Sequence, residues 1–160
     1  MDAQYSPIQI EEKWSKIWAD RELERPGSED HFSQIIPPPN VTGTLHMGHS
    51  FQYAIMDFYT RYHHMKGTDS YWQVGTDHAG IATQMVVENN LLNEGKSKDD
   101  LGREKFLDEV WKWKEYSEDK ISSQMKRLGI TVEWDKYRFT YDDDFCEGVN
   151  KAFVELYRKD

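Results

Sequence analysis

Residues Pro37 to His49 read PPPNVTGTLHMGH, and this stretch predicts an abrupt change from a strand to a helix. Prolines have no N–H to donate to a sheet, so they end the short apolar run from Phe32 to Ile36. From about His46 onward, apolar residues recur at helical spacing, and Gly67 closes that pattern. We therefore expect a strand that stops at Ile36, a loop, and a helix that begins near His46.

Strands and helices are expected to alternate along the rest of the chain. The residues Ser6-Pro7-Ile8-Gln9 have the pattern of a capped helix start, and Pro26-Gly27 is expected to end that helix. The other expected elements are a strand at 71–74, a helix at 81–92, a long helical region at 97–129, a short strand ending at Phe139, and a last helix capped by Thr140 with Asp143. This order predicts an α/β fold: the first half of a Rossmann-like parallel sheet with crossover helices, preceded by an N-terminal helix.

Aromatic and apolar side chains form stripes on the expected helices, and we expect these stripes to lie in the hydrophobic core. In the helix that begins near His46, the stripe comprises Phe51, Ile55, Phe58, Tyr59 and Tyr62. His63 and His64, at the end of the same helix, are interpreted as solvated residues that interact favourably with the helix dipole. The apolar pattern of the last helix still runs at Asp160, so we expect the chain to be part of something longer.

Composition excludes several classes of function. The 160 residues include 20 Lys and Arg against 29 Asp and Glu, and the net charge of -9 argues against sequence-independent nucleic-acid binding by this chain alone. Cys146 is the only cysteine, so there is no disulfide framework and no cysteine-based zinc site. The sequence shows neither an export signal nor an apolar segment that could span a membrane. These features predict a globular, cytoplasmic protein.

The loop after the first strand is the expected ligand site. In doubly wound sheets, ligands bind beyond the carboxyl ends of the strands, where helix N-termini offer unpaired N–H groups to phosphate. His46 and His49 are three residues apart, so both imidazoles can reach one ligand. Gly48 leaves room for a flat group such as a purine to lie against the backbone. Two histidine donors beside a phosphate suit nucleotidyl transfer, because charge builds on the phosphoryl oxygens.

Two other interpretations of the histidine pair compete with this one. A zinc site needs a third ligand, and no Cys, Glu or His lies at a recognised spacing, so we predict no metal bound by the protein itself. For a bare pair of histidines, an ordinary surface position would be the better interpretation. The prolines, the glycines and the position between strand and helix all agree, however, and together they favour a ligand site.

A second candidate segment is GTDHAGIATQ, Gly75 to Gln84, which follows the second expected strand. Asp77 can hold a substrate ammonium group through a charge-assisted hydrogen bond. Alternatively, Asp77 caps the helix that begins near Gly80, a common role for aspartate. The local sequence leaves both roles open.

The stretch PPPNVTGTLHMGH, followed by WQVGTDHAGIATQ, closely resembles the first half of the catalytic domain of the valyl-tRNA synthetases. His46-Met47-Gly48-His49 matches the first signature of class I aminoacyl-tRNA synthetases, and the resemblance extends to YSPIQIEEKWSKIW, GREKFLDEVWKWKEYS and MKRLGITVEWDKYRFT. It implies a helical extension at 1–30 and the first half of the class I catalytic domain at 31–160, ending before the editing insertion. The second ATP signature of the family, Lys-Met-Ser-Lys-Ser, does not occur, so we expect this chain to be inactive alone.

The resemblance also implies a reaction and residue roles. Valine and ATP, with Mg²⁺, would form valyl-adenylate, and the valyl group would pass to tRNA(Val), held mostly by parts outside this chain. His46 and His49 would contact the ATP phosphates, with Gly48 under the adenine. The residues implied in shaping the nucleotide loop are Thr42, Gly43 and Thr44, and those implied in valine binding are Pro38, Asn40 and Asp77. The alternatives are a stand-alone nucleotidyltransferase and a non-catalytic, ATP-binding paralogue.

Overall fold

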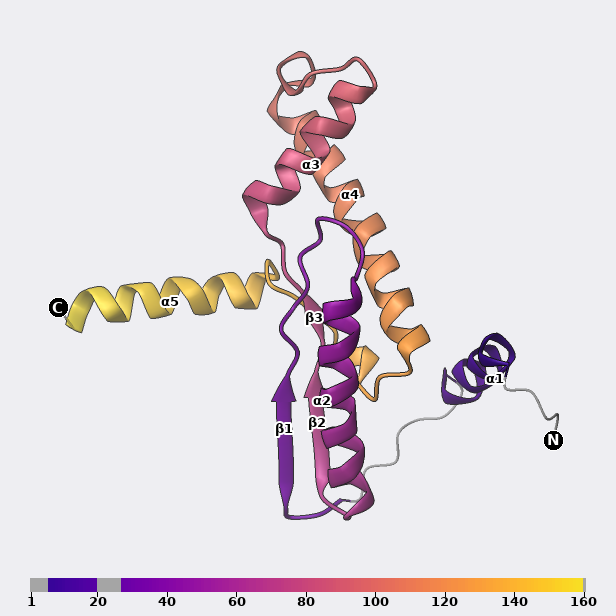
Figure 1. Ribbon diagram of the computed structural model, residues 1–160. Helices are drawn as coiled ribbons and strands as arrows, with labels where there is room; N and C mark the ends of the chain where they lie inside the picture. Colours follow the sequence, from indigo (N-terminus) through magenta and orange to yellow (C-terminus); the bar gives the residue numbers. More distant parts are fainter. Residues whose placement is uncertain (1–5, 20–26, 160) are drawn as a thin grey trace.

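The computed structural model describes residues 6–19 and 27–159. Helices and strands alternate along the chain (Figure 1). The elements are α1 (Pro7–Ala19), β1 (His31–Ile35), α2 (Met47–Met65), β2 (Asp69–Gln73), β3 (Gly75–Thr76), α3 (Gly80–Asn93), α4 (Lys98–Leu128), the 3-10 helix η1 (Trp134–Lys136), β4 (Arg138–Phe139) and α5 (Asp143–Lys159). The predicted order of elements is confirmed, with most boundaries within two residues.

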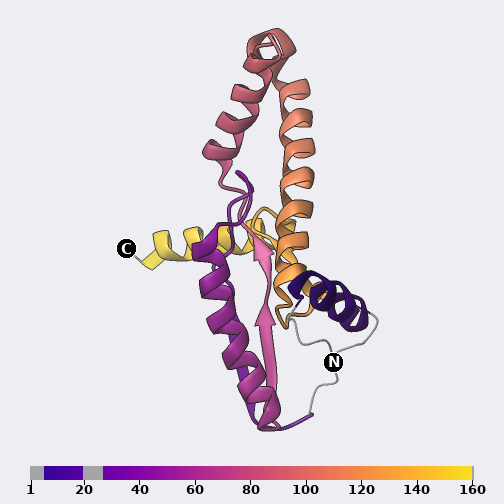
Figure 2. The ribbon, with the colours of Figure 1, turned by 45° about the vertical axis from the view of Figure 1, so that its right-hand side comes forward.

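The strands pair in parallel, as the alternation with helices predicts. β1 pairs with β2 in a register that places His31 opposite Asp69 and Ile35 opposite Gln73. β3 pairs with β4 in the same sense. The chain crosses from β1 to β2 through α2, which lies along these two strands in both Figure 1 and Figure 2. The α/β fold with parallel strands and a crossover helix is therefore confirmed.

Pro37 to Pro39 interrupt the pairing at the point where they were expected to do so. The Ile36 N–H, the last before the prolines, donates to the Gln73 carbonyl at 3.0 Å. Prolines have no N–H to donate, so the ladder breaks there. Pairing resumes at Asn40, which forms a parallel bridge with Asp77. The loop after β1 is thus held at both ends.

The hydrophobic core lies where α2 and α4 meet the strands and the segment after α4. Tyr53 of α2 is fully buried there, and so is Met125 of α4. The buried members of this cluster are Ile36, Tyr53, Trp72, Val74, Ile121, Met125, Ile130 and Val132. The helices α2 and α4 are therefore anchored in the same core.

The expectation that the aromatic stripe of α2 lies in the core is wrong. Phe51 is 70% exposed, and the other members of the predicted stripe are 44–64% exposed. The face that meets the sheet carries Tyr53, Met56 and Thr60 instead, and the Gln34 amide on β1 donates to the Met56 carbonyl at 2.7 Å. Apolar residues occur on more than one face of α2, and periodicity identifies an apolar face without identifying its neighbour.

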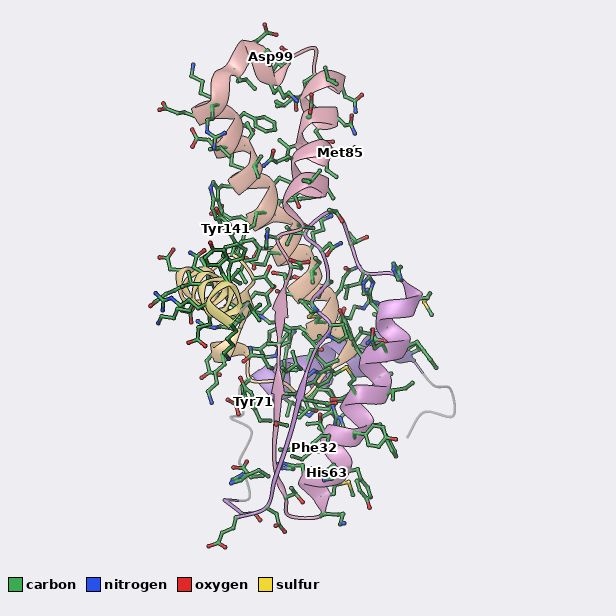
Figure 3. All side chains as sticks on the ribbon, turned by 90° about the vertical axis from the view of Figure 1, so that its left-hand side faces the viewer. Phe32, His63, Tyr71, Met85, Asp99 and Tyr141 are labelled. Carbon is green, nitrogen blue, oxygen red and sulfur yellow. The ribbon has the colours of Figure 1, made fainter. Side chains whose placement is uncertain are left out.

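His63 lies in the last turn of α2, as predicted, but its side chain is only partly solvated. Its ring stacks on Phe32 of β1 at a centroid distance of 3.9 Å, with the planes 8° apart. Figure 3 shows these two side chains together near the end of α2. Phe32 and His63 are 31 positions apart in the sequence, so only the packing of α2 on β1 brings them into contact.

The N-terminal helix α1 packs near the end of α4. Glu11 accepts a hydrogen bond from Arg127 at 3.0 Å, and the Trp18 ring lies against Gly129. Gly129 has a φ of 71°, a left-handed conformation that lets the chain leave α4 without a side chain in the way of that ring. The predicted end of the first helix at Pro26 lies outside the described residues.

The predicted cap of α4 is confirmed, and the helix itself is divided by a kink. The Ser97 hydroxyl accepts from the Asp100 N–H at 3.1 Å, as expected for the cap of α4. Within α4, Gly102 has a φ of 72°, so a kink separates the first turn from the rest. Together, α3 and α4 form a hairpin that extends away from the ends of the strands. The helix α5 projects to one side (Figures 1 and 2). None of the helices among the described residues is both long and apolar enough to cross a membrane.

We expect Gly75→Ala to destabilise the fold by roughly 1–3 kcal/mol, the usual effect of forcing extra atoms into a packed site. A Cβ at this position would lie 2.2 Å from the Arg138 carbonyl oxygen on β4. The measurement is the free energy of urea unfolding. Gly148→Ala in α5 is the matched control, because a Cβ there meets nothing within 4 Å and alanine favours a helix. Equal stability of the two variants would show that β3 and β4 adjust freely.

Candidate functional site

The two predicted ligand segments meet at the carboxyl edge of the strands. The Asp77 N–H donates to the Pro39 carbonyl at 2.8 Å, and the Val41 N–H donates to the Asp77 carbonyl at 3.0 Å. These bonds join the loop after β1 to the loop after β3. The backbones of the histidine loop and the Asp77 loop are therefore held next to each other.

His46 and His49 together cap the N-terminus of α2. The Gly48 N–H donates to His46 Nδ1 at 3.1 Å, and the His46 N–H donates to His49 Nδ1 at 3.2 Å. This is a capping box built from two imidazoles, with ring centroids 3.9 Å apart. Because each Nδ1 accepts a hydrogen bond, each neutral ring carries its proton on Nε2. The pair thus offers two Nε2–H donors at a helix N-terminus, the arrangement that suits phosphate.

Gly48 has a structural reason to lack a side chain. A Cβ at this position would lie 2.9 Å from Cε1 and 3.0 Å from Nδ1 of His46. The glycine therefore makes room for the imidazole that caps α2. The expectation that it also makes room for a purine stays a prediction.

The environment of His49 lowers its pKa below 6.5, first through burial and then through repulsion from His46. The unfolded chain therefore binds this proton more tightly than the folded chain does, and protonation also removes the Nδ1 acceptor. We expect this contribution to stability to be complete above pH 6.5 and to be lost as the pH falls from there through the lowered pKa.

His49→Gln is the control, because Gln at this position of a capping box keeps an acceptor and does not titrate. The measurement is the free energy of urea unfolding of both proteins, above and below pH 6.5. The wild type should lose more stability than the variant on acidification. An equal loss would show that His49 does not titrate in this range.

The loop from Val41 to Leu45 is held by α4. The Trp113 indole N–H donates to the Val41 carbonyl at 2.8 Å, and the Ser117 hydroxyl donates to the Gly43 carbonyl at 3.0 Å. The predicted nucleotide residues Thr42, Gly43 and Thr44 all lie in this loop, between β1 and the capped end of α2. The amino-acid sequence alone did not predict these contacts between α4 and the loop.

Asp77 does not cap α3. The residue in the N-cap position is Ala79, which has left-handed backbone angles of φ 40° and ψ 50° and makes no side-chain cap bond. Asp77 Oδ1 lies 3.4 Å from the Ala79 N–H and accepts a shorter bond, 2.7 Å, from the Thr140 hydroxyl. The helix-cap alternative for Asp77 is therefore wrong. The left-handed backbone of Ala79 is a separate feature: such backbone at a residue other than glycine is strained and is found mostly at functional sites.

Thr140 has a different role from the one predicted. It was expected to cap the last helix, but its hydroxyl donates to Asp77 and accepts from the His78 N–H at 2.9 Å. The His78 ring nitrogen Nδ1 is 2.7 Å from the same oxygen. The Asp142 carbonyl, not Thr140, accepts the first bond of α5, from the Cys146 N–H at 3.0 Å. The contacts of Thr140 with Asp77 and His78 were missed, because Thr140 lies 63 and 62 residues after them in the sequence.

One oxygen of Asp77 remains available to a ligand. The three contacts of the carboxylate, to Thr140, Ala79 and His78, all involve Oδ1, and within the described part of the chain nothing bonds to Oδ2. The side chain is 36% exposed. Pro38 and Asn40, the other predicted valine residues, are exposed in the loop that bonds to Asp77. The carboxyl edge of the strands therefore presents Asp77 Oδ2 beside the exposed loop residues Pro38 and Asn40.

Residues 6–19 and 27–159 contain no group of three or more His, Cys, Asp or Glu side chains arranged to hold a metal ion. The groups at the site are two histidine N–H donors, a helix N-terminus and one carboxylate. This combination favours a ligand with both phosphate and ammonium groups.

The parallel strands and the histidine-capped helix at their carboxyl edge indicate a nucleotide-binding α/β domain. The family model described as tRNA synthetases class I (I, L, M and V) matches residues 9–160. The chain belongs to this family of class I tRNA synthetases.

Within the family, the relatives that it resembles are valine–tRNA ligases. The one from Acinetobacter baylyi is 53% identical over 154 residues, which is 96% of this chain and 16% of that protein. The one from Legionella pneumophila (strain Paris) is 52% identical over 160 residues, 99% of this chain and 17% of that protein. The chain thus spans about a sixth of the length of these relatives.

A solved structure has the same fold. LeuRS from Agrobacterium radiobacter K84, in a ternary complex with tRNA and LeuAMS, superposes with a TM-score of 0.70. The match covers 98% of this chain and 18% of that one, with 22% sequence identity. The likeness confirms that the chain has the fold of a class I synthetase domain.

Proposed function

We propose that this chain supplies the first half of the amino-acid activation site of a valine–tRNA ligase. The supporting observation is that the histidine-capped start of α2 and the Asp77 carboxylate belong to two loops joined by backbone hydrogen bonds of 2.8 and 3.0 Å. One loop suits the phosphates of ATP and the other suits an amino-acid ammonium group. The valine–tRNA ligases at 52–53% identity support valine as the amino acid.

The reaction would proceed in two steps. A valine carboxylate oxygen attacks the α-phosphorus of ATP, the bond to the β-phosphate oxygen breaks, and pyrophosphate leaves. A ribose hydroxyl at the 3′ end of tRNA(Val) then attacks the valyl carbonyl, and AMP leaves. Mg²⁺ would enter as part of the ATP substrate, and the cytoplasm is the compartment in which we expect the reaction.

Each predicted site residue has a role in this proposal. His46 and His49 donate from Nε2 to ATP phosphate oxygens, where these donors stabilise developing charge. Gly48 lies under the adenine, and the loop of Thr42, Gly43 and Thr44 surrounds the nucleotide. The valine-binding group consists of the Asp77 carboxylate, the Pro38 carbonyl and Asn40. We also propose 1–30 as a helical extension and 31–160 as the catalytic half-domain.

The test uses the full product of the gene that encodes this chain. We expect it to exchange labelled pyrophosphate into ATP when valine is present, and much more slowly with leucine or methionine. Exchange that needs no amino acid would favour the stand-alone nucleotidyltransferase. ATP binding without exchange would favour the non-catalytic paralogue, and exchange that is fastest with leucine or methionine would exclude valine as the substrate.

A further inference from the structure

Three side chains of α4 bind the backbone of the loop between β1 and α2. Trp113 and Ser117 donate to the carbonyls of Val41 and Gly43, as described above. The third contact is the Leu45 N–H, which donates to Gln124 Oε1 at 2.9 Å. The bonded loop residues are at positions 41, 43 and 45, so α4 pairs with alternate residues, as a neighbouring strand would.

The three side chains lie on one face of a firmly anchored helix. Trp113, Ser117 and Gln124 are separated by four and seven positions, which places them on one side of α4. Ser117 is 1% exposed. Ile121 and Met125, also buried, fix the same stretch of α4 in the core. The loop is therefore bonded to a stretch of α4 that is anchored in the core.

The loop depends on these contacts for its position. Val41 to Leu45 belongs to neither a helix nor a strand, and buried backbone groups need hydrogen-bond partners. Its last residue precedes His46, whose ring caps α2. A shift of the loop would therefore move both the nucleotide-binding backbone and the histidine donors, and displacements of about 1 Å can cost about 100-fold in rate.

We propose that α4 positions the nucleotide loop, with Trp113, Ser117 and Gln124 as positioning residues for ATP. The inference rests on the proposed function, because that function assigns the loop to the nucleotide. It goes beyond the signature residues, because these three side chains come from a helix 72–79 positions further along the chain. On the valine side of the proposed site, the Asp77 carboxylate accepts from the Thr140 hydroxyl and not from a side chain of α4.

The experiment compares variants of the full gene product in valine-dependent pyrophosphate exchange. Ser117→Ala, Trp113→Phe and Gln124→Leu each remove one hydrogen bond to the loop. We expect each to lower kcat/KM for ATP by about tenfold, the upper range for one such bond, and to leave KM for valine within about twofold. Gln124→Glu keeps an acceptor for the Leu45 N–H and should restore most of the activity.

Ser123→Ala is the matched control, since Ser123 is an exposed serine on the same helix. It should leave both kinetic constants unchanged. An equal loss for ATP and valine, a loss of thermal stability without a kinetic change, or an equal effect of Ser123→Ala would overturn the inference.

Direct ATP binding by calorimetry separates this inference from the proposed function. If the wild type binds ATP but shows no valine-dependent exchange, the proposed function is wrong. The inference then still stands if Ser117→Ala weakens ATP binding and Ser123→Ala does not. If neither variant changes ATP affinity or exchange kinetics, α4 does not position the loop.

Discussion

His46→Ala in the full gene product is expected to slow valine-dependent pyrophosphate exchange by about 100-fold or more, the usual effect of losing one preorganised donor. In the proposed site, the Nε2–H of His46 donates to a phosphate oxygen while its Nδ1 accepts from the Gly48 N–H, at 3.1 Å. Valine affinity should change little, because Asp77 lies in the other loop. The measurement is the exchange rate at saturating substrates, together with valine binding by calorimetry.

Alanine at this position removes two functions at once, and His46→Asn separates them. Asparagine caps helices well, whereas alanine at an N-cap costs about 1 kcal/mol of stability. We expect His46→Asn to keep the unfolding free energy and to lose the exchange activity, since its short side chain has no donor at the Nε2 position. Full activity of His46→Asn would show that the cap, and not the outward donor, is what the reaction needs.

Asp77→Asn should weaken valine binding by roughly 1.5–3 kcal/mol, the usual value of a hydrogen bond to a charged group. This corresponds to a factor of about 10–150 in affinity. Asparagine retains an oxygen for the Thr140 hydroxyl, 2.7 Å from Oδ1, so the local fold should persist. Only the charge that attracts the ammonium group is removed. Calorimetry of valine binding to the full gene product measures the effect.

Thr140→Val provides the accompanying control for Asp77. It removes the hydroxyl that orients the carboxylate but keeps the charge, so valine affinity should fall by less than in Asp77→Asn. Unfolding free energies of both variants, measured alongside, show whether the site is intact. Valine affinity within a factor of two of the wild type in Asp77→Asn would move the ammonium site elsewhere.

The features that the sequence predicted correctly depend on short segments. Ser97 and Asp100 form the expected cap of α4, and the prolines end the pairing of β1 where their missing N–H groups require it. The start of α2 at the histidine stretch was also predicted within one residue. Caps, turns and proline effects act over three or four residues, so they can be read without knowledge of the fold.

The candidate site was predicted in part. The alternation of strands and helices placed the His46 loop and the Asp77 loop at one edge, and the structure joins them. The sequence left open whether Asp77 caps a helix, and Ala79 in the N-cap position excludes that role. The imidazole capping box was not predicted, because the sequence indicates that two histidines share a face but not which ring nitrogen accepts a bond.

By itself, then, the amino-acid sequence determined the order of the elements, the parallel strands and the edge that carries the histidine pair. Only the tertiary structure decided which face of α2 is buried, that Thr140 bonds to Asp77, and that α4 bonds to the loop from Val41 to Leu45. The contacts of Thr140 and α4 join residues 63–79 positions apart. Such contacts depend on how helices pack on the sheet, and packing selects one of several apolar faces by shape complementarity that local periodicity does not encode.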